Sequence, residues 1–445
     1  MVYPVLKIFN SKRIDDLKLI SGSTINLYLC GPTVYDHVHI GNLRSVIVFD
    51  VIHRILLHLG CRVNYVHNLT DVDDKIIQKA QKNKTSEGEI TKYYIEAYLQ
   101  NLTDYNILSP TSTPRATDYI ALMQDFVRIL LQKKVAYQQG ENILFRLDNQ
   151  FQYGQISKQK IDRLRGGVRQ IVQVEKDNPK DFVLWKNTQQ GVNWSSPWGE
   201  GRPGWHTECA VFIHQLFQAK TIDIHGGGID LIFPHHENER IQYLAVNKKE
   251  LSKIWLHVGH LHWKEEKMSK SLKNTLLAKD FFSKYGANVL RYLFLNSHYN
   301  QTINLDQQLI QQGLDYIQKI KNFLKRLRFY MFIKKLNLIE EEIKAKDEII
   351  QNLLNNLNTI KILYFLDQIT QSLNKMIDQG KQNKDFLISV NDFYFILDIL
   401  GFKFSLPSYN LETQKLIKKW EGLKKNQQYS EADKIRSQLQ EMDII

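Results

Sequence analysis

Residues 24–66, TINLYLCGPTVYDHVHIGNLRSVIVFDVIHRILLHLGCRVNYV, decide the fold of this chain. Apolar side chains alternate through residues 24–30, which predicts a strand with one buried face. Apolar side chains then recur at helical spacing through residues 45–59, and Gly60 supplies the left-handed cap that ends many helices. Residues 63–66 predict the next strand. A strand, a helix and a strand in this order form a βαβ unit, so we expect a parallel sheet with its ligand crevice at the carboxyl ends of the strands.

The rest of the chain divides into an interrupted α/β part and a helical part. Helical periodicity runs through residues 86–134, short strands and a passage rich in Gly, Pro and Trp occupy residues 137–205, and strand signals return at 221–225 and 254–257. Leucines at helical spacing then dominate to the end. We therefore predict an α/β fold, a Rossmann-type parallel-sheet catalytic domain split by an insertion and followed by an all-α C-terminal domain. The expected regions are residues 1–114 for the first half of the Rossmann-type domain, 115–204 for the connective insertion, 205–260 for the second half, 261–320 for a lysine-loop region and 321–445 for the helical domain.

Composition excludes several classes of protein. The 445 residues include 59 Lys and Arg against 47 Asp and Glu, a net charge of +12, and 43% of them are hydrophobic. This content excludes a mostly disordered chain, and no run approaches the about 18 apolar residues that span a bilayer. The three cysteines are scattered, which excludes a disulfide framework and fits a reducing compartment. We expect a cytoplasmic protein, or a plastid stroma protein if an organelle encodes it, whose basic charge favours a polyanionic partner such as nucleic acid.

The loop between the first predicted strand and helix carries polar groups toward the helix start. His37, His39 and Asn42 place two imidazoles and an amide beside backbone N–H groups that carry positive partial charge. Gly41, which has no side chain, lets a flat ring or a phosphate approach the backbone. The loop therefore predicts an anion site. A simpler interpretation is that the two histidines only cap the helix.

A second polar loop reads Lys267-Met-Ser-Lys270-Ser. Its two ammonium groups and two hydroxyls suit a triphosphate, because lysines stabilise negative charge that develops on phosphate oxygens. A short, mobile loop would also open for the release of pyrophosphate. Further along the chain, the basic run at residues 319–328 could contact phosphates or could be an ordinary solvated helix face.

The stretch FPHHENE carries a third set of reactive side chains. If a helix begins at its proline, Pro234, then His235 and Glu239 lie four residues apart on one face and can bind the same metal. His236 and Glu237 would point elsewhere.

Two cysteines complete this set. Cys30 ends the first predicted strand, where the crevice is expected, and Cys209 lies in the stretch WHTEC. Cys30, Cys209, His235 and Glu239 together make a tetrahedral site for zinc, since thiolate and imidazole ligands exclude magnesium and calcium. A free cysteine is more often a small buried apolar residue, and this remains our interpretation of Cys61.

The first two loops together resemble the HIGH and KMSKS signatures of the class I aminoacyl-tRNA synthetases. Over nearly its full length, the chain is similar to the cysteinyl-tRNA synthetases of that class. The stretches that carry this resemblance are YLCGPTVY at 28–35, NLTDVDDK at 68–75, DFVLWK at 181–186, SPWG at 196–199, GWHTEC at 204–209, DIHGGG at 223–228, the stretch FPHHENE and the lysine loop.

The resemblance implies a ligase that activates L-cysteine with ATP and Mg²⁺ and transfers it to the 3′ end of the cysteine tRNA. It places one zinc ion per chain on the four residues named above, and it encloses the substrate cysteine with Thr70, Trp205 and His225. Residues 261–320 would contact the tRNA stem and residues 321–445 would bind the tRNA at its anticodon. We expect a monomer that does not associate with a membrane. The residues that would meet ATP are His37, His39, Gly41, Asn42, Gly228, Asp230 and Lys270, and those that would carry catalysis are His39, Asn42, Lys267 and Lys270.

The zinc would serve amino-acid selection. Shape alone separates cysteine from serine or alanine by about 1–3 kcal/mol, whereas protein synthesis needs about 10⁴-fold, or about 5.5 kcal/mol. A zinc ion that accepts the substrate thiolate as a further ligand prefers sulfur to oxygen strongly enough to supply this difference. Asn42 departs from the family, which has histidine there; an amide donates a hydrogen bond but cannot become cationic.

Two other functions fit parts of the sequence. A ligase that joins activated cysteine to the amine of an amino sugar would share the catalytic half, but it has no use for a long basic helical region. A catalytically silent RNA-binding protein with structural zinc would consume no ATP when given cysteine.

Overall fold

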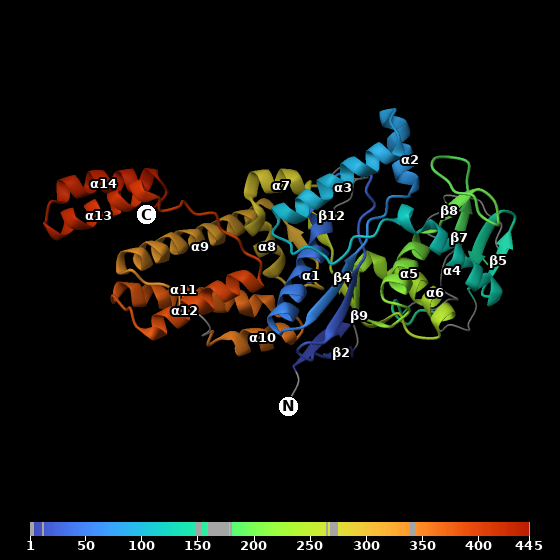
Figure 1. The fold of residues 1–445 in the computed structure, drawn as a ribbon, viewed down its shortest axis with the longest axis horizontal. Helices are drawn as coiled ribbons and strands as arrows, with labels where there is room; N and C mark the ends of the chain where they lie inside the picture. Colours follow the sequence, from blue (N-terminus) through green and yellow to red (C-terminus); the bar gives the residue numbers. More distant parts are fainter. Residues whose placement is uncertain are drawn as a thin grey trace.

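A four-stranded parallel sheet with the order β10-β9-β3-β4 lies at the centre of the computed structural model (Figure 1). The predicted βαβ unit is present as β3 (Thr24–Leu29), α1 (Ile40–His58) and β4 (Arg62–His67). β9 (Ile222–Gly228) and β10 (Ser252–Val258) return to the same sheet after the insertion. The structure describes residues 4–10, 13–147, 153–158, 178, 180–263, 266–267, 275–338 and 343–444.

Helix α1 begins five residues before the start that the periodicity predicts. Its first turn is closed by Asn42, whose Oδ1 accepts a hydrogen bond from the backbone N–H of His39 at 3.1 Å. Ile40 and Leu43 in this turn are fully buried. The first turn of the helix is therefore formed by a polar cap and two separated apolar residues. The predicted start was too late because this turn does not continue the apolar periodicity of the rest of the helix. At the other end Gly60 has a φ of +73°, as its predicted capping role requires.

The insertion between β4 and β9 forms its own antiparallel sheet with the order β5-β6-β7-β8. Helix α4 (Ile120–Gln132) packs its apolar face against this sheet. The Trp-rich passage that we expected to be a loop ends in the short strand β8 (Gly201–Pro203). The other strands are β5 (Ala136–Gln139), β6 (Asn142–Phe145) and β7 (Phe182–Asn187).

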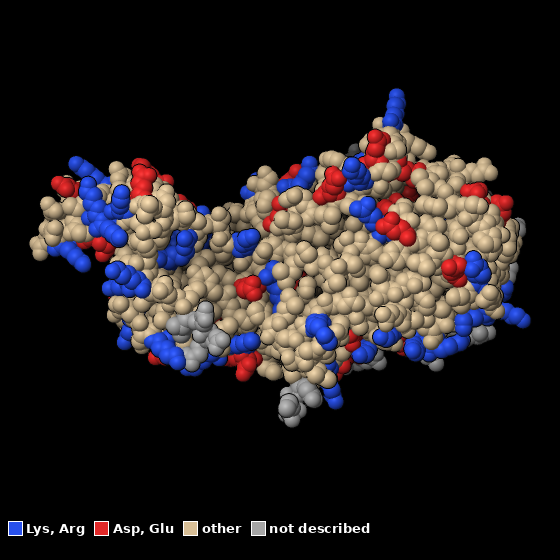
Figure 2. Space-filling model, viewed as in Figure 1, with Lys and Arg blue, Asp and Glu red and all other residues tan. Residues whose placement is uncertain are grey.

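The C-terminal part is helical, and its helices extend away from the sheet (Figure 1). The 28-residue helix α9 (Gln307–Lys334) runs without a break through the boundary expected at residue 320. Helices α13 (Leu411–Lys425) and α14 (Tyr429–Glu441) form a lobe at the end farthest from the antiparallel sheet, and Figure 2 shows Lys and Arg side chains over it. The helices between the sheet and this lobe are α7 (Ala278–Tyr285), α8 (Ala287–Leu295), α10 (Lys346–Leu354), α11 (Thr359–Asp378) and α12 (Lys384–Ile399).

Smaller elements complete the molecule. A two-stranded sheet forms near the N-terminus, and a three-stranded sheet with the order β12-β11-β13 carries the start of the lysine loop. No helix in the described ranges combines the length and the apolar character that crossing a membrane requires. The elements are β1 (Val5–Asn10), β2 (Arg13–Lys18), α2 (Asp74–Asn83), α3 (Glu87–Asp104), α5 (Trp205–Leu216), α6 (Glu237–Asn247), β11 (Leu261–Trp263), β12 (Glu266–Lys267) and β13 (Ile303–Leu305).

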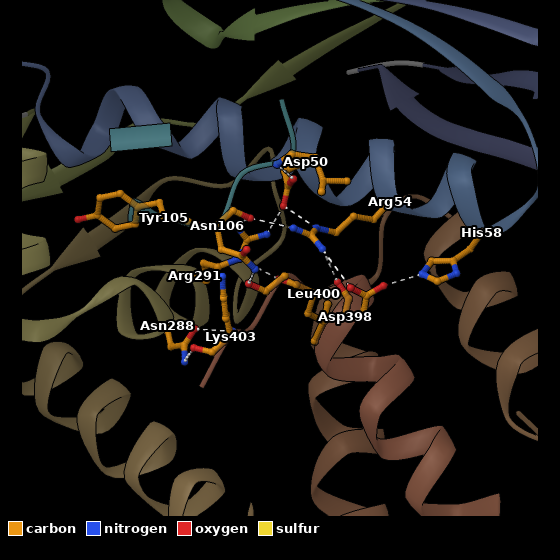
Figure 3. Close-up of polar contacts among 12 residues, drawn as sticks. Asp50, Arg54, His58, Tyr105, Asn106, Asn288, Arg291, Asp398, Leu400 and Lys403 are labelled. Atoms are coloured by element: carbon orange, nitrogen blue, oxygen red, sulfur yellow. Dashed lines mark hydrogen bonds and ion pairs between the residues drawn. The ribbon is translucent and has the colours of Figure 1, made fainter. Parts of the chain in front are cut away.

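A buried ionic network ties α1 to the helical part (Figure 3). Asp50 on α1 accepts hydrogen bonds from Arg54, at 2.9 Å, and from Arg291 on α8. Arg54 also reaches Asp398 on α12, which lies 2.9 Å from the Nε2 atom of His58. Because these pairs join three helices distant in sequence, the far end of α1 is held against both α8 and α12.

Candidate active site

A cavity of about 680 Å³ opens at the carboxyl ends of the central strands, where the βαβ unit predicts the ligand crevice. Its walls come from the loop after β3, the start of α1, the end of β9 and the start of α5. The predicted site residues that line it are Cys30, His39, Gly41, Asn42, Trp205, Gly228 and Asp230.

The four predicted metal ligands come together beside this cavity, with their donor atoms all within 4.8 Å of one another. The Sγ atoms of Cys30 and Cys209 are 3.9 Å apart, and Cys209 Sγ is 3.6 Å from His235 Nε2. Glu239 Oε1 lies 3.6 Å from Cys30 Sγ and 2.7 Å from His235 Nε2. The ligands come from four separate places in the sequence: the end of β3, α5, the turn before α6, and α6 itself.

The donor set and its spacing fit a tetrahedral metal ion. A tetrahedron with arms of about 2.0–2.3 Å has edges of about 3.3–3.8 Å, close to three of these distances. Burial raises the pKa of the Cys30 thiol. Burial acts to lower the pKa of His235, but the Glu239 carboxylate beside it raises this pKa to about 10. Burial acts to raise the pKa of Glu239, but His235 and His225 hold it well below its usual value.

His236 corrects one of our expectations. It was predicted to point away from the site, but its Nε2 atom lies 3.5 Å from Cys30 Sγ and its Nδ1 atom lies 2.8 Å from His257 Nε2. The chain bends just before the two histidines, at Phe233, whose φ of −139° and ψ of 132° are not helical, and both histidines face the cluster. Glu237 does point away from the cluster, and its carboxylate accepts hydrogen bonds from backbone N–H groups of the insertion.

The three residues expected around the substrate side chain also lie beside this cluster. The Trp205 ring stacks on His235 with centroids 4.0 Å apart, and His225 Nε2 lies 2.6 Å from Glu239 Oε2. Thr70 donates its hydroxyl to the buried carboxylate of Glu208 at 3.0 Å. The side chains of Thr70 and His225 are buried, so this part of the site is shielded from water.

Sequence reasoning missed two aromatic residues of this site. Tyr28, His225 and Trp255 are in register on three neighbouring strands, so their side chains form one row across the sheet. The His225 ring lies 5.1 Å from the Tyr28 ring and 4.5 Å from the Trp255 ring. The alternation in β3 places Tyr28 on the same face as Cys30, and this signal could have identified it.

The residues expected around ATP gather at the start of α1 and the end of β9. His39 is the N-cap of α1, and a Cβ atom on Gly41 would lie 2.9 Å from its Nδ1 atom, so only glycine fits there. A Cβ atom on Gly228 would similarly lie 2.5 Å from Asp230 Oδ1. The His37 ring packs against Tyr93 and Tyr94 of α3.

The two lysines of the second loop are placed only in part. Lys267 lies on β12, paired with His262 of β11, and Lys270 lies outside the described residues. After that loop, the chain returns to the start of α1, where the backbone N–H of Ile40 donates to Leu276 O at 2.9 Å. The described flanks of the lysine loop therefore meet the crevice at the helix start.

Comparison with known proteins identifies the family. The family profile described as the catalytic domain of class I (C) tRNA synthetases matches residues 16–315. A cysteine–tRNA ligase of Mesoplasma florum is 40% identical over 99% of this chain and 100% of its own length, and one of Mycoplasma capricolum is 42% identical over 96% and 98%. The chain belongs to the cysteine–tRNA ligase family.

A more distant aminoacyl-tRNA synthetase shares the fold of this chain. Methionyl-tRNA synthetase of Mycobacterium tuberculosis, solved with methionyl-adenylate, superposes with a TM-score of 0.60 at 14% identity, covering 89% of this chain and 91% of that one. At this identity the likeness shows the fold alone. It confirms the predicted α/β class, and the full-length relatives confirm the predicted resemblance.

Proposed function

We propose that the protein activates L-cysteine with ATP and Mg²⁺ to cysteinyl adenylate, with release of pyrophosphate, and then transfers the cysteine to the 3′ end of the cysteine tRNA. Family membership over almost the whole chain supports this reaction. The observation that carries the choice of amino acid is the buried cluster of two thiols, an imidazole and a carboxylate beside the cavity.

In this proposal Cys30, Cys209, His235 and Glu239 hold one zinc ion. Zinc supplies, when bound, a further coordination position that takes thiolate in preference to hydroxyl. The residues around it exclude water and fix the substrate side chain. Trp205, stacked on His235, closes the pocket, and the buried His225 holds Glu239 in place through the 2.6 Å contact between Nε2 and Oε2.

The start of α1 and the lysine loop would handle the nucleotide. The N–H groups of the first helical turn carry positive partial charge and suit the phosphates, and Gly41 and Gly228 line the cavity, where a residue without a side chain lets the flat adenosine approach the backbone. His39 and Asn42 would donate hydrogen bonds to phosphate oxygens. The Oδ1 atom of Asn42 caps the helix, so its Nδ2 group is the donor it offers to a ligand. The whole set of proposed ATP contacts is His37, His39, Gly41, Asn42, Gly228, Asp230 and Lys270, and the proposed catalytic residues are His39, Asn42, Lys267 and Lys270.

For tRNA, the helical part offers two basic surfaces, and we favour the lobe of α13 and α14. The basic run on α9 is occupied by ion pairs, since Lys319 lies 2.7 Å from Asp367 and Lys321 lies 3.1 Å from Asp443. This pairing supports the solvated-face interpretation of that run. The two helices of the lobe carry seven Lys and Arg against five Asp and Glu, and Figure 2 shows side chains of both signs at its surface. We propose that it binds the tRNA at its anticodon end and that residues 261–320 contact the stem.

We further propose a monomer that works in the cytoplasm or in a plastid stroma. The three cysteines are free thiols, which supports a reducing compartment. Sedimentation of the purified protein at micromolar concentration should give the 52.4 kDa mass of one chain.

The test of this function is the exchange of labelled pyrophosphate into ATP, measured with cysteine, serine and alanine, together with a zinc assay. We expect exchange with cysteine, about 10⁴-fold less with serine, and one zinc per chain. Charging of the cysteine tRNA separates this function from an amino-sugar ligase. A protein that binds tRNA but exchanges no pyrophosphate with cysteine would be a silent RNA-binding protein.

A further inference from the structure

An exposed group of aromatic and basic side chains borders the cavity on the side of α2 and α3. Its members come from the loop after β3 and from the two helices, which Figure 1 shows side by side above the central sheet. We call this group the aromatic rim, and it consists of Tyr35, His37, Lys75, Lys79, Tyr93 and Tyr94.

The rings of the rim contact one another, but the Tyr93 ring stays exposed to solvent. Tyr93 and Tyr94 pack edge to face with centroids 4.9 Å apart, and the His37 ring lies 5.7 Å and 5.2 Å from them. Tyr94 packs on the small apolar cluster between α2 and α3. Tyr93, in contrast, is 56% exposed. The packing of the two helices therefore accounts for Tyr94 and not for Tyr93.

Ammonium groups alternate with these rings. Lys75 Nζ lies 5.3 Å from the centroid of the Tyr35 ring, and Lys79 Nζ lies 5.6 Å from that of Tyr94. Lys79 also lies 3.6 Å from the Asp36 carboxylate, which positions it over the rim. Aromatic faces interleaved with cations are the features that bind single-stranded nucleic acid, because bases stack on rings while phosphates meet the positive charges.

The rim is continuous with the cavity. Tyr35 and Lys75 line the cavity together with Cys30 and Trp205, and Tyr98 on α3 lines it as well. Tyr94 and Tyr98 are four residues apart, so they lie on the same face of α3, which leads from the rim into the cavity. A strand that enters the cavity along this face passes over the rim first.

We propose that the aromatic rim binds the unpaired 3′ end of the tRNA, with one base stacked on Tyr93 and a phosphate contacted by Lys75. This inference rests on the proposed function, which requires the 3′ end of a tRNA to reach the cavity. The inference adds the residues that bind the 3′ strand where it enters the cavity.

The test compares the affinity of the protein for the intact cysteine tRNA and for the same tRNA trimmed of its unpaired 3′ nucleotides. Tyr93→Ala should weaken binding of the intact tRNA about tenfold and leave binding of the trimmed tRNA unchanged, since one base–ring stack contributes about 1–3 kcal/mol. Tyr93→Phe, which keeps the ring, should bind both as the wild type does. Leu99→Ala is the control for loss of an exposed apolar side chain from the same helix, because Leu99 on α3 is 37% exposed and does not belong to the rim.

A second variant tests the phosphate contact independently. Lys75→Gln should reduce the slope of log affinity against log salt by about 0.7 with the intact tRNA only. An equal loss for intact and trimmed tRNA, or no loss in either variant, would overturn the role of the rim. If the wild-type protein binds neither tRNA, the proposed function itself fails, and this outcome is distinct from the first.

Discussion

Two buried clusters of ionisable side chains lie at opposite ends of the same βαβ unit, and they differ in how their charges are balanced. Asp50, Arg54 and Arg291 are buried, and in this network (Figure 3) the acid is matched by guanidinium groups. Burial acts to raise the pKa of Asp50, but Arg291 and Arg54 hold it below its usual value. The charge of the buried acid is therefore balanced within the network.

In the cluster of Cys30, Cys209, His235 and Glu239, three residues are buried and Cys30 is half-buried. Its carboxylate contacts the imidazoles of His235 and His225, and the two thiols beside them are groups that bind a metal cation. Buried charge is tolerated in proteins when it is paired or bound to metal. The comparison indicates that the arginine network is structural and that the thiol cluster is built for a ligand.

The largest effect we predict comes from breaking the thiol cluster. Cys209→Ser should lose zinc, and its selectivity for cysteine over serine should fall by about 10²–10³-fold, since the about 1–3 kcal/mol that shape contributes remains. Zinc content and pyrophosphate exchange with both amino acids measure this. Cys61→Ser is the matched control, because this third thiol is also buried but donates to the backbone oxygen of Ile20, away from the metal-ligand set. Wild-type zinc content in Cys209→Ser would refute the ligand set.

Breaking the arginine network should instead cost stability. Arg291→Ala leaves the Asp50 charge buried with one partner fewer, and we expect a loss of about 3–5 kcal/mol in the free energy of unfolding. Urea unfolding followed by fluorescence measures it, and the folded fraction should keep its zinc. Lys319→Ala, which breaks an exposed ion pair with Asp367, should cost less than about 1 kcal/mol. Equal effects of the two variants would contradict the structural role of the network.

A smaller effect is expected from His67, a buried base with no counter-charge. Burial lowers the pKa of His67 to about 4, and its ring bonds Leu29 O at 3.0 Å and the Tyr98 hydroxyl at 2.6 Å. As the pH falls, His67 is protonated in the unfolded chain before it is protonated in the folded protein. The contribution of neutral His67 to the free energy of unfolding is therefore complete above about pH 6.5 and is lost as the pH falls toward 4. At pH 5 the loss is about 2 kcal/mol. The melting temperature of His67→Gln should therefore fall less between pH 7 and pH 5 than that of the wild type.

The sequence predicts those features that depend on local spacing. Strand alternation and helical periodicity gave the βαβ unit, and the four-residue separation of His235 and Glu239 predicted their contact. The inward orientation of His236 was not predictable, because the chain bends at Phe233, where no sequence pattern marks the bend. The pairing of Arg54 with Asp398 spans 344 residues, and no local pattern identifies such a partner. The row of Tyr28, His225 and Trp255 likewise required the order of the strands.

Zinc X-ray absorption, recorded on the zinc-loaded protein with and without cysteine, tests the central claim most directly. We predict two sulfur ligands from Cys30 and Cys209 in the protein alone, three when cysteine is added, and two when serine is added instead. A sulfur count that stays at two with saturating cysteine would contradict recognition of the substrate thiol by a metal held in this cluster.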